Sequence, residues 1–193
     1  MTATSPVSPD LRGVMRDFAT GVCVATTYAD RDGARRHDAV TLNSLTSVSL
    51  HPPLVSLSLH RESRFLGDLL ETKKWAVAIL DGEAEPLARS LARGRAERAE
   101  VVDHLAARPG SETGALLLDA MAGLECVLRD SFEIGDHTMV IGEVVATAGG
   151  DHRPPLLFLH GGFRQLPPAT DAVAAPPAAV PAAAALAAAP KES

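Results

Sequence analysis

One short stretch of the chain, residues 41–49, carries an unusual density of hydroxyl and amide side chains. Its sequence is Thr-Leu-Asn-Ser-Leu-Thr-Ser-Val-Ser, so six of its nine residues can form side-chain hydrogen bonds, although apolar segments flank it on both sides. A polar group left without a partner near a core costs about 1–3 kcal/mol. We therefore expect these side chains either to turn back onto the backbone as Ser/Thr turns or to line a polar ligand site.

The kind of ligand follows from the chemistry of these groups. Hydroxyls and free backbone amides bind phosphate oxygens without needing a glycine-rich loop. The chain contains no GxGxxG or GxxxxGK[ST] pattern, which argues against a Rossmann or P-loop nucleotide site. The stretch thus indicates a ligand that bears phosphate and amide groups, with self-contained turns as the alternative.

A second candidate is the sequence Gly135-Asp136-His137. Gly-Asp is typical of a turn, and the histidine either donates a hydrogen bond to a ligand at a barrel mouth or merely begins a strand. The other histidines show no HxH, HExxH or Cys-His spacing, so no metal site is expected. A hydrolase is not expected either, because there is no GxSxG elbow and adjacent Asp136 and His137 would face opposite sides of a strand.

The elements that position these residues are mainly strands. Apolar and alternating runs predict strands at 22–28, 36–40, 54–59, 75–80, 124–132, 137–145 and 156–159, with a last segment at 163–166. Helices are predicted at 63–71 and 83–93, together with an amphipathic helix capped by Ser8 whose apolar residues are Leu11, Val14, Met15 and Phe18. The segment 95–120 predicts no element. Many strands at hairpin spacing with few helices favour a small antiparallel barrel over a βαβ fold.

Composition excludes several classes of protein. The net charge of −6, with basic residues scattered among acids, argues against a nucleic-acid partner. No uninterrupted apolar run of about 20 residues precedes the C-terminal tail, and residues 1–10 lack the pattern of a secretory signal, so no membrane association is expected. Cys23 and Cys126 lie far apart and outside any CxxC motif, which predicts reduced, buried thiols in a cytoplasmic protein.

The chain is expected to divide into three segments. Residues 1–10 form a short N-terminal extension and residues 11–166 one folded domain. From Pro167 to Pro190, 19 of 24 residues are Ala or Pro. Such a sequence has little surface to bury and many helix-breaking positions, so residues 167–193 are predicted to be a disordered tail.

Taken in order, the motifs of the chain resemble those of the flavin reductase-like family. The matching segments are Phe18-Ala19-Thr20-Gly21-Val22, Ala25-Thr26-Thr27, Thr41-Leu42-Asn43-Ser44, Ser47-Val48-Ser49-Leu50, Pro52-Pro53-Leu54-Val55, Ser63, Trp75-Ala76-Val77, Leu124-Glu125-Cys126, Gly135-Asp136-His137, Ile141-Gly142-Glu143-Val144, Pro155-Leu156-Leu157-Phe158 and Phe163-Arg164. The resemblance covers about residues 11–166. The sequence departs from the family at Arg98-Ala99, where a basic-Phe pair is usual, at Leu91, where Phe is frequent, and at Phe163, which replaces a common Tyr.

The resemblance implies a mainly β fold with a few helices, the FMN-binding split barrel. This is a six-stranded antiparallel barrel with a Greek-key core, usually a homodimer with flavin near the subunit interface. Carried over by position, the flavin-binding residues are Thr41, Asn43 and Ser44 at the isoalloxazine edge, Ser47, Val48 and Ser49 beside the ribityl chain and phosphate, and Ser63 at the phosphate. His137 matches a histidine associated with nicotinamide binding.

The activity implied is hydride transfer from NADH or NADPH to FMN or FAD, supplying reduced flavin to a separate flavin-dependent monooxygenase. No residue is implied as a covalent or acid-base catalyst, because the enzyme aligns two rings and stabilises the charge of the reduced flavin. No 2′-phosphate clamp is evident, which favours NADH. Two alternatives stay open: a split-barrel monooxygenase or oxidase that retains its flavin, and a flavin- or heme-binding protein without turnover.

Overall fold

The computed structural model describes residues 10–150 and 152–167. Residues 1–9 of the predicted N-terminal extension, including the capping residue Ser8, and nearly all of the predicted Ala/Pro-rich tail lie outside these residues. No helix in the described part is long and apolar enough to cross a membrane.

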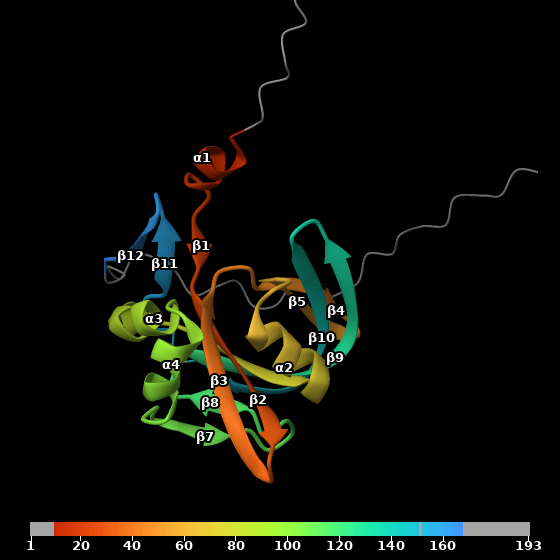
Figure 1. The fold of residues 1–193 in the computed structure, drawn as a ribbon. Coiled ribbons are helices and arrows are strands. Elements are labelled where there is room, and N and C mark those ends of the chain that lie inside the picture. The colour runs from red at the N-terminus through yellow and green to blue at the C-terminus, as the bar shows by residue number, and fades with distance from the viewer. Residues whose placement is uncertain (1–9, 151, 168–193) are drawn as a thin grey trace, which may run out of the picture.

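A curled seven-stranded sheet forms the body of the molecule (Figure 1), and all of its strand pairs are antiparallel. The strand order is β3-β2-β6-β9-β10-β5-β4. The strands are β2 (Cys23–Arg31), β3 (Ala34–Leu42), β4 (Thr46–Leu50), β5 (Pro53–His60), β6 (Lys74–Ile79), β9 (Ala122–Ile134) and β10 (His137–Gly149). The antiparallel, mainly β prediction is confirmed. The sheet has seven strands rather than six, and its end strands β3 and β4 do not pair within the described residues, so the barrel stays open.

Two smaller sheets and several helices complete the fold. One sheet joins β1 (Thr20–Gly21), β11 (Leu156–Leu159) and β12 (Gly162–Gln165), and the other joins β7 (Ala107–Pro109) and β8 (Leu116–Leu118). The helices are α1 (Leu11–Met15), α2 (Arg64–Thr72), η1 (Gly82–Ala84), α3 (Glu85–Leu91) and α4 (Arg95–Val102). The segment 95–120, for which the sequence predicts no element, therefore contains α4, β7 and β8.

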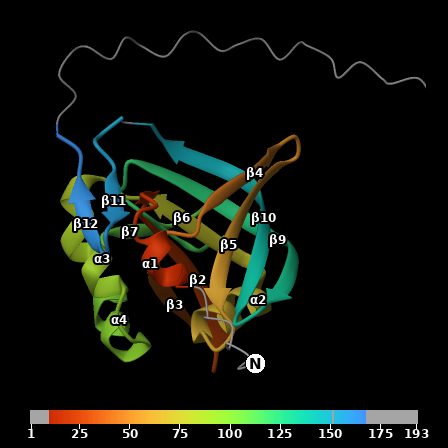
Figure 2. The same cartoon turned by 90° about the horizontal axis from the view of Figure 1, so that it is seen from above.

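Helices cover both faces of the sheet at β2 and β3, because β2 buries residues on both sides, Cys23 and Ala25 on one and Val24 on the other. On one face, Phe65 and Leu69 of α2 pack with Trp75 and Leu57 in the first core. On the other face, α3, α4 and β11 build the second core, which includes Val24, Ala39, Leu91, Val102 and Leu156. Figures 1 and 2 show α2 inside the curve of the sheet and α3 and α4 on its outer side.

Several element boundaries differ from the sequence prediction. The β2–β3 strands extend as far as a tight turn in which Asp32 and Gly33 both have positive φ, a conformation that closes two-residue hairpins. The polar stretch 41–49 contains the end of β3, a short loop and all but the last residue of β4. The helix predicted at 83–93 is shorter and is preceded by η1.

The N-terminal helix α1 is also shorter than predicted. Its N-cap is Asp10, whose carboxylate accepts a hydrogen bond of 2.8 Å from the Gly13 amide. None of its residues is buried, and Leu11 and Val14 are 68% and 71% exposed. The amphipathic pattern therefore predicts a helix here, but its apolar face has no partner within the described chain.

Candidate functional site

The loop between β3 and β4 is fixed to β5 by Ser44. Its hydroxyl donates to the Ser58 carbonyl at 3.0 Å and accepts from the Ser58 amide at 3.2 Å. These two bonds use the donor of the hydroxyl and fix the loop beside the middle of β5. Ser44 therefore positions the loop, and its side chain has no proton left to donate to a ligand.

Thr41 and Asn43 are tied to the other side of the sheet. The Thr41 hydroxyl donates to the Ala88 carbonyl in α3 at 2.8 Å, and the Asn43 side-chain amide donates to the Thr20 hydroxyl at 3.0 Å. Both residues line a cavity of about 170 Å³, whose other walls are Val22, Leu42, Ala92, Phe158 and Phe163. Asn43 keeps its side-chain carbonyl and one N–H for a ligand, whereas Thr41 offers only its oxygen as an acceptor.

The predicted residues of β4 lie at an irregular point of the sheet. Ser47 pairs with Val55 and Ser49 with Leu54, so the intervening Val48 has no opposite residue on β5. Val48 is 52% exposed, and Ser49 accepts a hydrogen bond of 3.2 Å from the His51 amide. The hydroxyl of Ser47 has no hydrogen-bond partner within the described residues, which leaves it available to a ligand.

Ser63 is the N-cap residue of α2, yet its hydroxyl does not cap the helix. Its backbone is extended, with φ −68° and ψ 122°, and its amide donates to the His60 carbonyl at 2.9 Å. The N-terminus of a helix carries partial positive charge and unsatisfied N–H groups, which favour a bound anion. An unengaged hydroxyl at this place fits the phosphate contact implied by the resemblance.

His137 begins β10, directly opposite His60 of β5. Its Nδ1 lies 2.7 Å from the Asp136 carboxylate, and its ring meets that of His60 edge-on with centroids 5.4 Å apart. The hydrogen bond from His137 lowers the pKa of Asp136, so this carboxylate is ionised at neutral pH. This contact orients the ring and leaves Nε2 as the nitrogen available to a ligand.

The contact between Asp136 and His137 corrects one step of the sequence argument. We expected these adjacent side chains to face opposite sides of a strand, but Asp136 lies in the β9–β10 turn and reaches back to the ring. This does not create a hydrolytic triad, because the Ser44 hydroxyl is engaged with Ser58. The described residues also contain no group of three or more His, Cys, Asp or Glu side chains placed to hold a metal ion.

The structure joins His137 to the N-terminus of α2 through the turn after β5. The Arg61 amide donates to the Asp136 carbonyl at 3.0 Å, and His60 accepts from the Ser63 amide in the same turn. Ser58, which holds the Ser44 loop, and His60 lie two residues apart on one face of β5. Ser44, Ser63 and His137 are thus assembled around the end of β5, whereas Thr41 and Asn43 contact α3 and β1.

Sequence reasoning missed His60, which supports the predicted nicotinamide residue. His60 belongs to no recognised motif and matches no metal-ligand spacing. Its signal is the polar alternation Ser56, Ser58, His60 opposite the buried Val55, Leu57 and Leu59. Such alternation marks a strand whose second face meets solvent or a ligand.

The two cysteines are buried and free, as predicted. Burial raises the pKa of Cys23 to about 12, and burial followed by the nearby Glu125 charge raises that of Cys126 to about 12. A thiol with such a pKa is protonated at neutral pH and is a poor nucleophile.

The free groups at the candidate site are therefore hydroxyl, amide and imidazole donors and acceptors. That set fits the amide edge and phosphate of a flavin and the carboxamide of a nicotinamide.

Comparisons with known proteins agree with the ligands that this donor set fits, a flavin and a nicotinamide. The family model described as Flavin reductase like domain matches residues 15–167. An NADH-dependent FAD reductase of Streptomyces globisporus is 36% identical over 163 residues, covering 83% of this chain and 87% of that protein.

Solved structures show the same likeness. A Streptomyces globisporus NADH:FAD oxidoreductase in complex with NAD and FAD fragments aligns with a TM-score of 0.75 and 34% identity, covering 87% of this chain and 100% of that one. The flavin reductase component of a bacterial two-component tryptophan halogenase aligns with a TM-score of 0.73 and 35% identity, covering 81% and 96%. The resemblance seen in the sequence motifs is confirmed, and the chain belongs to the flavin reductase like domain family.

Proposed function

We propose that this protein is an NADH-dependent flavin reductase that passes a hydride from NADH to FMN or FAD. The observation that carries the proposal is the family match over nearly the whole described chain, together with similar proteins named for NADH and FAD. Bound NADH supplies the hydride, and N5 of the flavin accepts it. The protein itself needs to bind, orient and stabilise charge, and every free polar group at the site is suited to that task.

Five of the predicted site residues have a definite task in this proposal. The Ser44 side chain fixes the β3–β4 loop so that its backbone amides face the ring edge, while Asn43 contributes its unengaged amide groups. The hydroxyls of Ser47 and Ser63 bind the ribityl chain and phosphate. His137, held by Asp136, accepts a hydrogen bond from the nicotinamide carboxamide and aligns that ring.

Consumption of NADH by the purified protein with added riboflavin, FMN or FAD tests the proposal. We expect oxidation only when a flavin is present. Background oxidation with all three flavins would refute the activity. A protein that keeps a flavin through gel filtration would instead favour the flavin-retaining alternative.

A Ser63→Ala variant tests the phosphate contact in the same assay. The lost hydrogen bond is worth about 0.5–1.5 kcal/mol, so the KM for FMN should rise about 2–13-fold. Riboflavin lacks the phosphate, and its KM should not change. Ser90→Ala, on the exposed side of α3, is the matched control. Equal effects on riboflavin and FMN would rule out a phosphate role for Ser63.

We also propose that the reduced flavin is delivered to a separate monooxygenase. A similar structure is the flavin reductase component of a two-component halogenase, in which the reductase is one of two separate components. The assay is to supply a flavin-dependent monooxygenase with NADH, flavin and this protein. Product formation that stops when the reductase is omitted is the expected result.

A homodimer is proposed from the unpartnered apolar surface. Leu11, Val14 and Phe18 are each more than 60% exposed, and Phe132 and Ile134 at the end of β9 are 48% and 57% exposed. Clusters of exposed large apolar side chains mark interaction surfaces. Light scattering should give twice the chain mass, and Val14→Glu should shift it to one chain mass. A monomeric mass for the unaltered protein would refute the dimer.

The remaining parts of the proposal concern location and domain limits. The buried free thiols and the use of NADH support a cytoplasmic protein. Residues 11–166 are proposed to suffice for flavin reduction, with 167–193 as an appended tail. Removal of 168–193 should leave kcat and KM unchanged, and a loss of activity would show that the tail takes part.

A further inference from the structure

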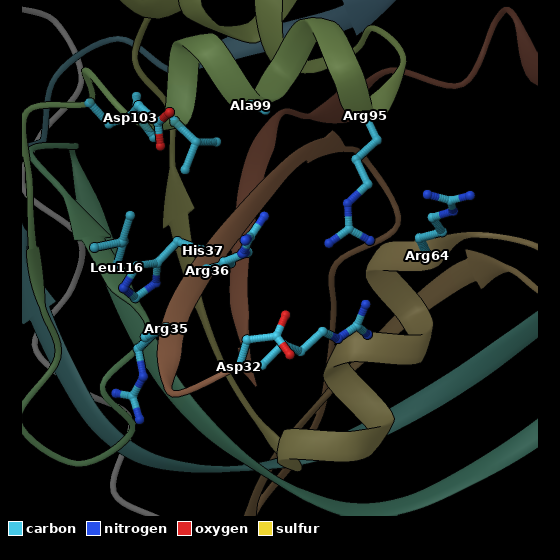
Figure 3. Close-up of a pocket in the computed structure, with 12 residues that line it drawn as sticks. Asp32, Arg35, Arg36, His37, Arg64, Arg95, Ala99, Asp103 and Leu116 are labelled. Carbon is cyan, nitrogen blue, oxygen red and sulfur yellow. The ribbon is translucent and has the colours of Figure 1, made fainter.

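One large cavity lies away from the residues that the family motifs single out. It has a volume of about 830 Å³ and opens between α2 and α4, over the N-terminal half of the edge strand β3. Pockets of this size hold small molecules such as nucleotides. Figure 3 shows Arg95 pointing from α4 into the space above β3, with Arg64 beside it on α2.

Arginines dominate the lining of this cavity. Five of its twelve residues are arginine, in a protein whose net charge is −6. Three of them already have acidic partners: Arg31 binds Asp68, Arg35 binds Asp30, and Arg95 bridges Asp68 and Asp38. Arg36 and Arg64 form no ion pair within the described residues, so their guanidinium groups are available to an anion.

The free cation Arg64 lies at the end of the cavity nearest the predicted flavin residues. Arg64 directly follows Ser63 and opens α2, and Asp68, one helical turn later, binds Arg95 at 2.5 Å. Residues four apart share a helix face, so Arg64 and Arg95 converge on the same part of the cavity. A phosphate at this end meets two guanidinium groups and the positive end of a helix.

The opposite end of the cavity has a different character. Its walls are Ala99, Val102, Leu105 and Leu116, with Asp103 at the C-terminus of α4. His37 adds a flat ring whose Nδ1 is buried without a hydrogen-bond partner. Burial, followed by the charge of Arg35, lowers the pKa of His37, so this ring is neutral. Asp103 lies eight residues beyond Arg95, about 12 Å along the helix axis.

We propose that this cavity binds the adenosine diphosphate part of a dinucleotide substrate, an inference that rests on the proposed function. The diphosphate lies against Arg64, Arg36 and Arg95. The adenine lies between the flat His37 ring and the apolar wall, where Asp103 accepts from the ribose hydroxyls or the amine. FAD and NADH both contain this moiety, whereas FMN and riboflavin do not.

Calorimetric titration with ADP tests the site without requiring turnover. We expect ADP to bind the unaltered protein and to bind Arg64→Gln at least about tenfold more weakly, since a hydrogen bond to a charged group is lost. Arg108→Gln, an exposed arginine on β7 with the same charge change and no ion pair in the described chain, should bind ADP normally. Absent ADP binding, or equal weakening by both substitutions, would overturn the proposal.

Steady-state kinetics identify which dinucleotide uses the site. If FAD does, Arg64→Gln raises the KM for FAD more than that for FMN, which carries only one of the two phosphates and no adenosine. If NADH does, it raises the KM for NADH more than that for reduced nicotinamide mononucleotide, for the same reason. ADP binding with no change in either KM would refute the role in substrate binding. Failure here is separable from failure of the reductase activity, because reduction of FMN by NADH measures that activity directly.

Discussion

Replacement of Gly142 by alanine should destabilise the fold through one defined clash. Gly142 lies in β10, paired with Leu128 of β9 and Val55 of β5. A Cβ at this position would lie 2.2 Å and 2.5 Å from two carbons of the Trp75 ring and 3.1 Å from the Cys126 Cβ. Trp75 is fully buried in the first core, so it cannot move aside into solvent.

The size of the effect can be worked out from two opposing terms. Replacing glycine by alanine in a strand is by itself favourable by about 0.5–1 kcal/mol, because the unfolded chain loses freedom. Inserting a methyl group into a well-packed core costs about 1–3 kcal/mol, and more where the neighbour is a rigid ring. We expect a net loss of about 1–2 kcal/mol, which for a domain of this size lowers Tm by about 2–8 °C.

Urea denaturation followed by circular dichroism measures this loss, with two comparisons that isolate the clash. Gly67→Ala in α2 adds a methyl group that meets nothing within 4 Å and should stabilise the protein by about 0.5–1 kcal/mol. In a Trp75→Phe background the clashing ring carbons are absent, so Gly142→Ala should cost at least about 1 kcal/mol less. The reasoning fails if Gly142→Ala matches Gly67→Ala, or if its cost is the same in both backgrounds.

Three further outcomes are expected. His137→Ala should raise the KM for NADH several-fold while FMN binding, measured by fluorescence quenching, stays unchanged; an unaltered KM would exclude the nicotinamide contact. Burial alone would raise the pKa of Glu125, but hydrogen bonds from the Thr113 hydroxyl and nearby amides outweigh it and lower the pKa. The ionised form therefore stabilises the fold above about pH 4.5 and this contribution is lost as the pH falls, so the urea midpoints of the unaltered protein and Glu125→Gln should converge in acid. Cys23 and Cys126 should resist a thiol reagent in the native protein and react only after unfolding; rapid native labelling would contradict their burial.

Local patterns were sufficient to predict most of the sheet. Apolar runs place β2, β5, β6, β9 and β10 because each buries at least one face, and the period of two is visible without tertiary information. The turn at Asp32-Gly33 is equally local, since positive φ there depends on residue type. The segment 95–120 was not predictable in this way. Its loop near Thr113 is held by the distant carboxylate of Glu125, which accepts two amides and a hydroxyl.

The same division explains which parts of the site the sequence could reveal. Residue type shows that Thr41, Ser44 and Ser63 each need a hydrogen-bond partner, but it does not say whether that partner is the protein or a ligand. The structure answers differently for each: the hydroxyls of Thr41 and Ser44 bond to backbone groups 47 and 14 residues away, and the Ser63 hydroxyl has no partner among the described residues. A motif therefore identifies a region, and only the pairing within the fold separates its positioning residues from its binding residues.

The arginine-lined cavity illustrates the converse limit. Arg36, Arg64 and Arg95 are widely spaced in a chain with 18 basic residues, so no local pattern distinguishes them from ordinary surface charges. They converge because β3 is an edge strand, so α2 on one face and α4 on the other come together beside its free edge. The buried carboxylate of Asp68 in α2 also binds both Arg31 and Arg95. Arg31 and Arg95 pair with buried aspartates, whereas Arg36 and Arg64 form no ion pair within the described residues. Arginines that resemble ordinary surface residues in the sequence therefore form an anion-binding surface only in the folded protein. For this reason the proposed adenosine diphosphate site needs its own test, which the motif residues alone would not suggest.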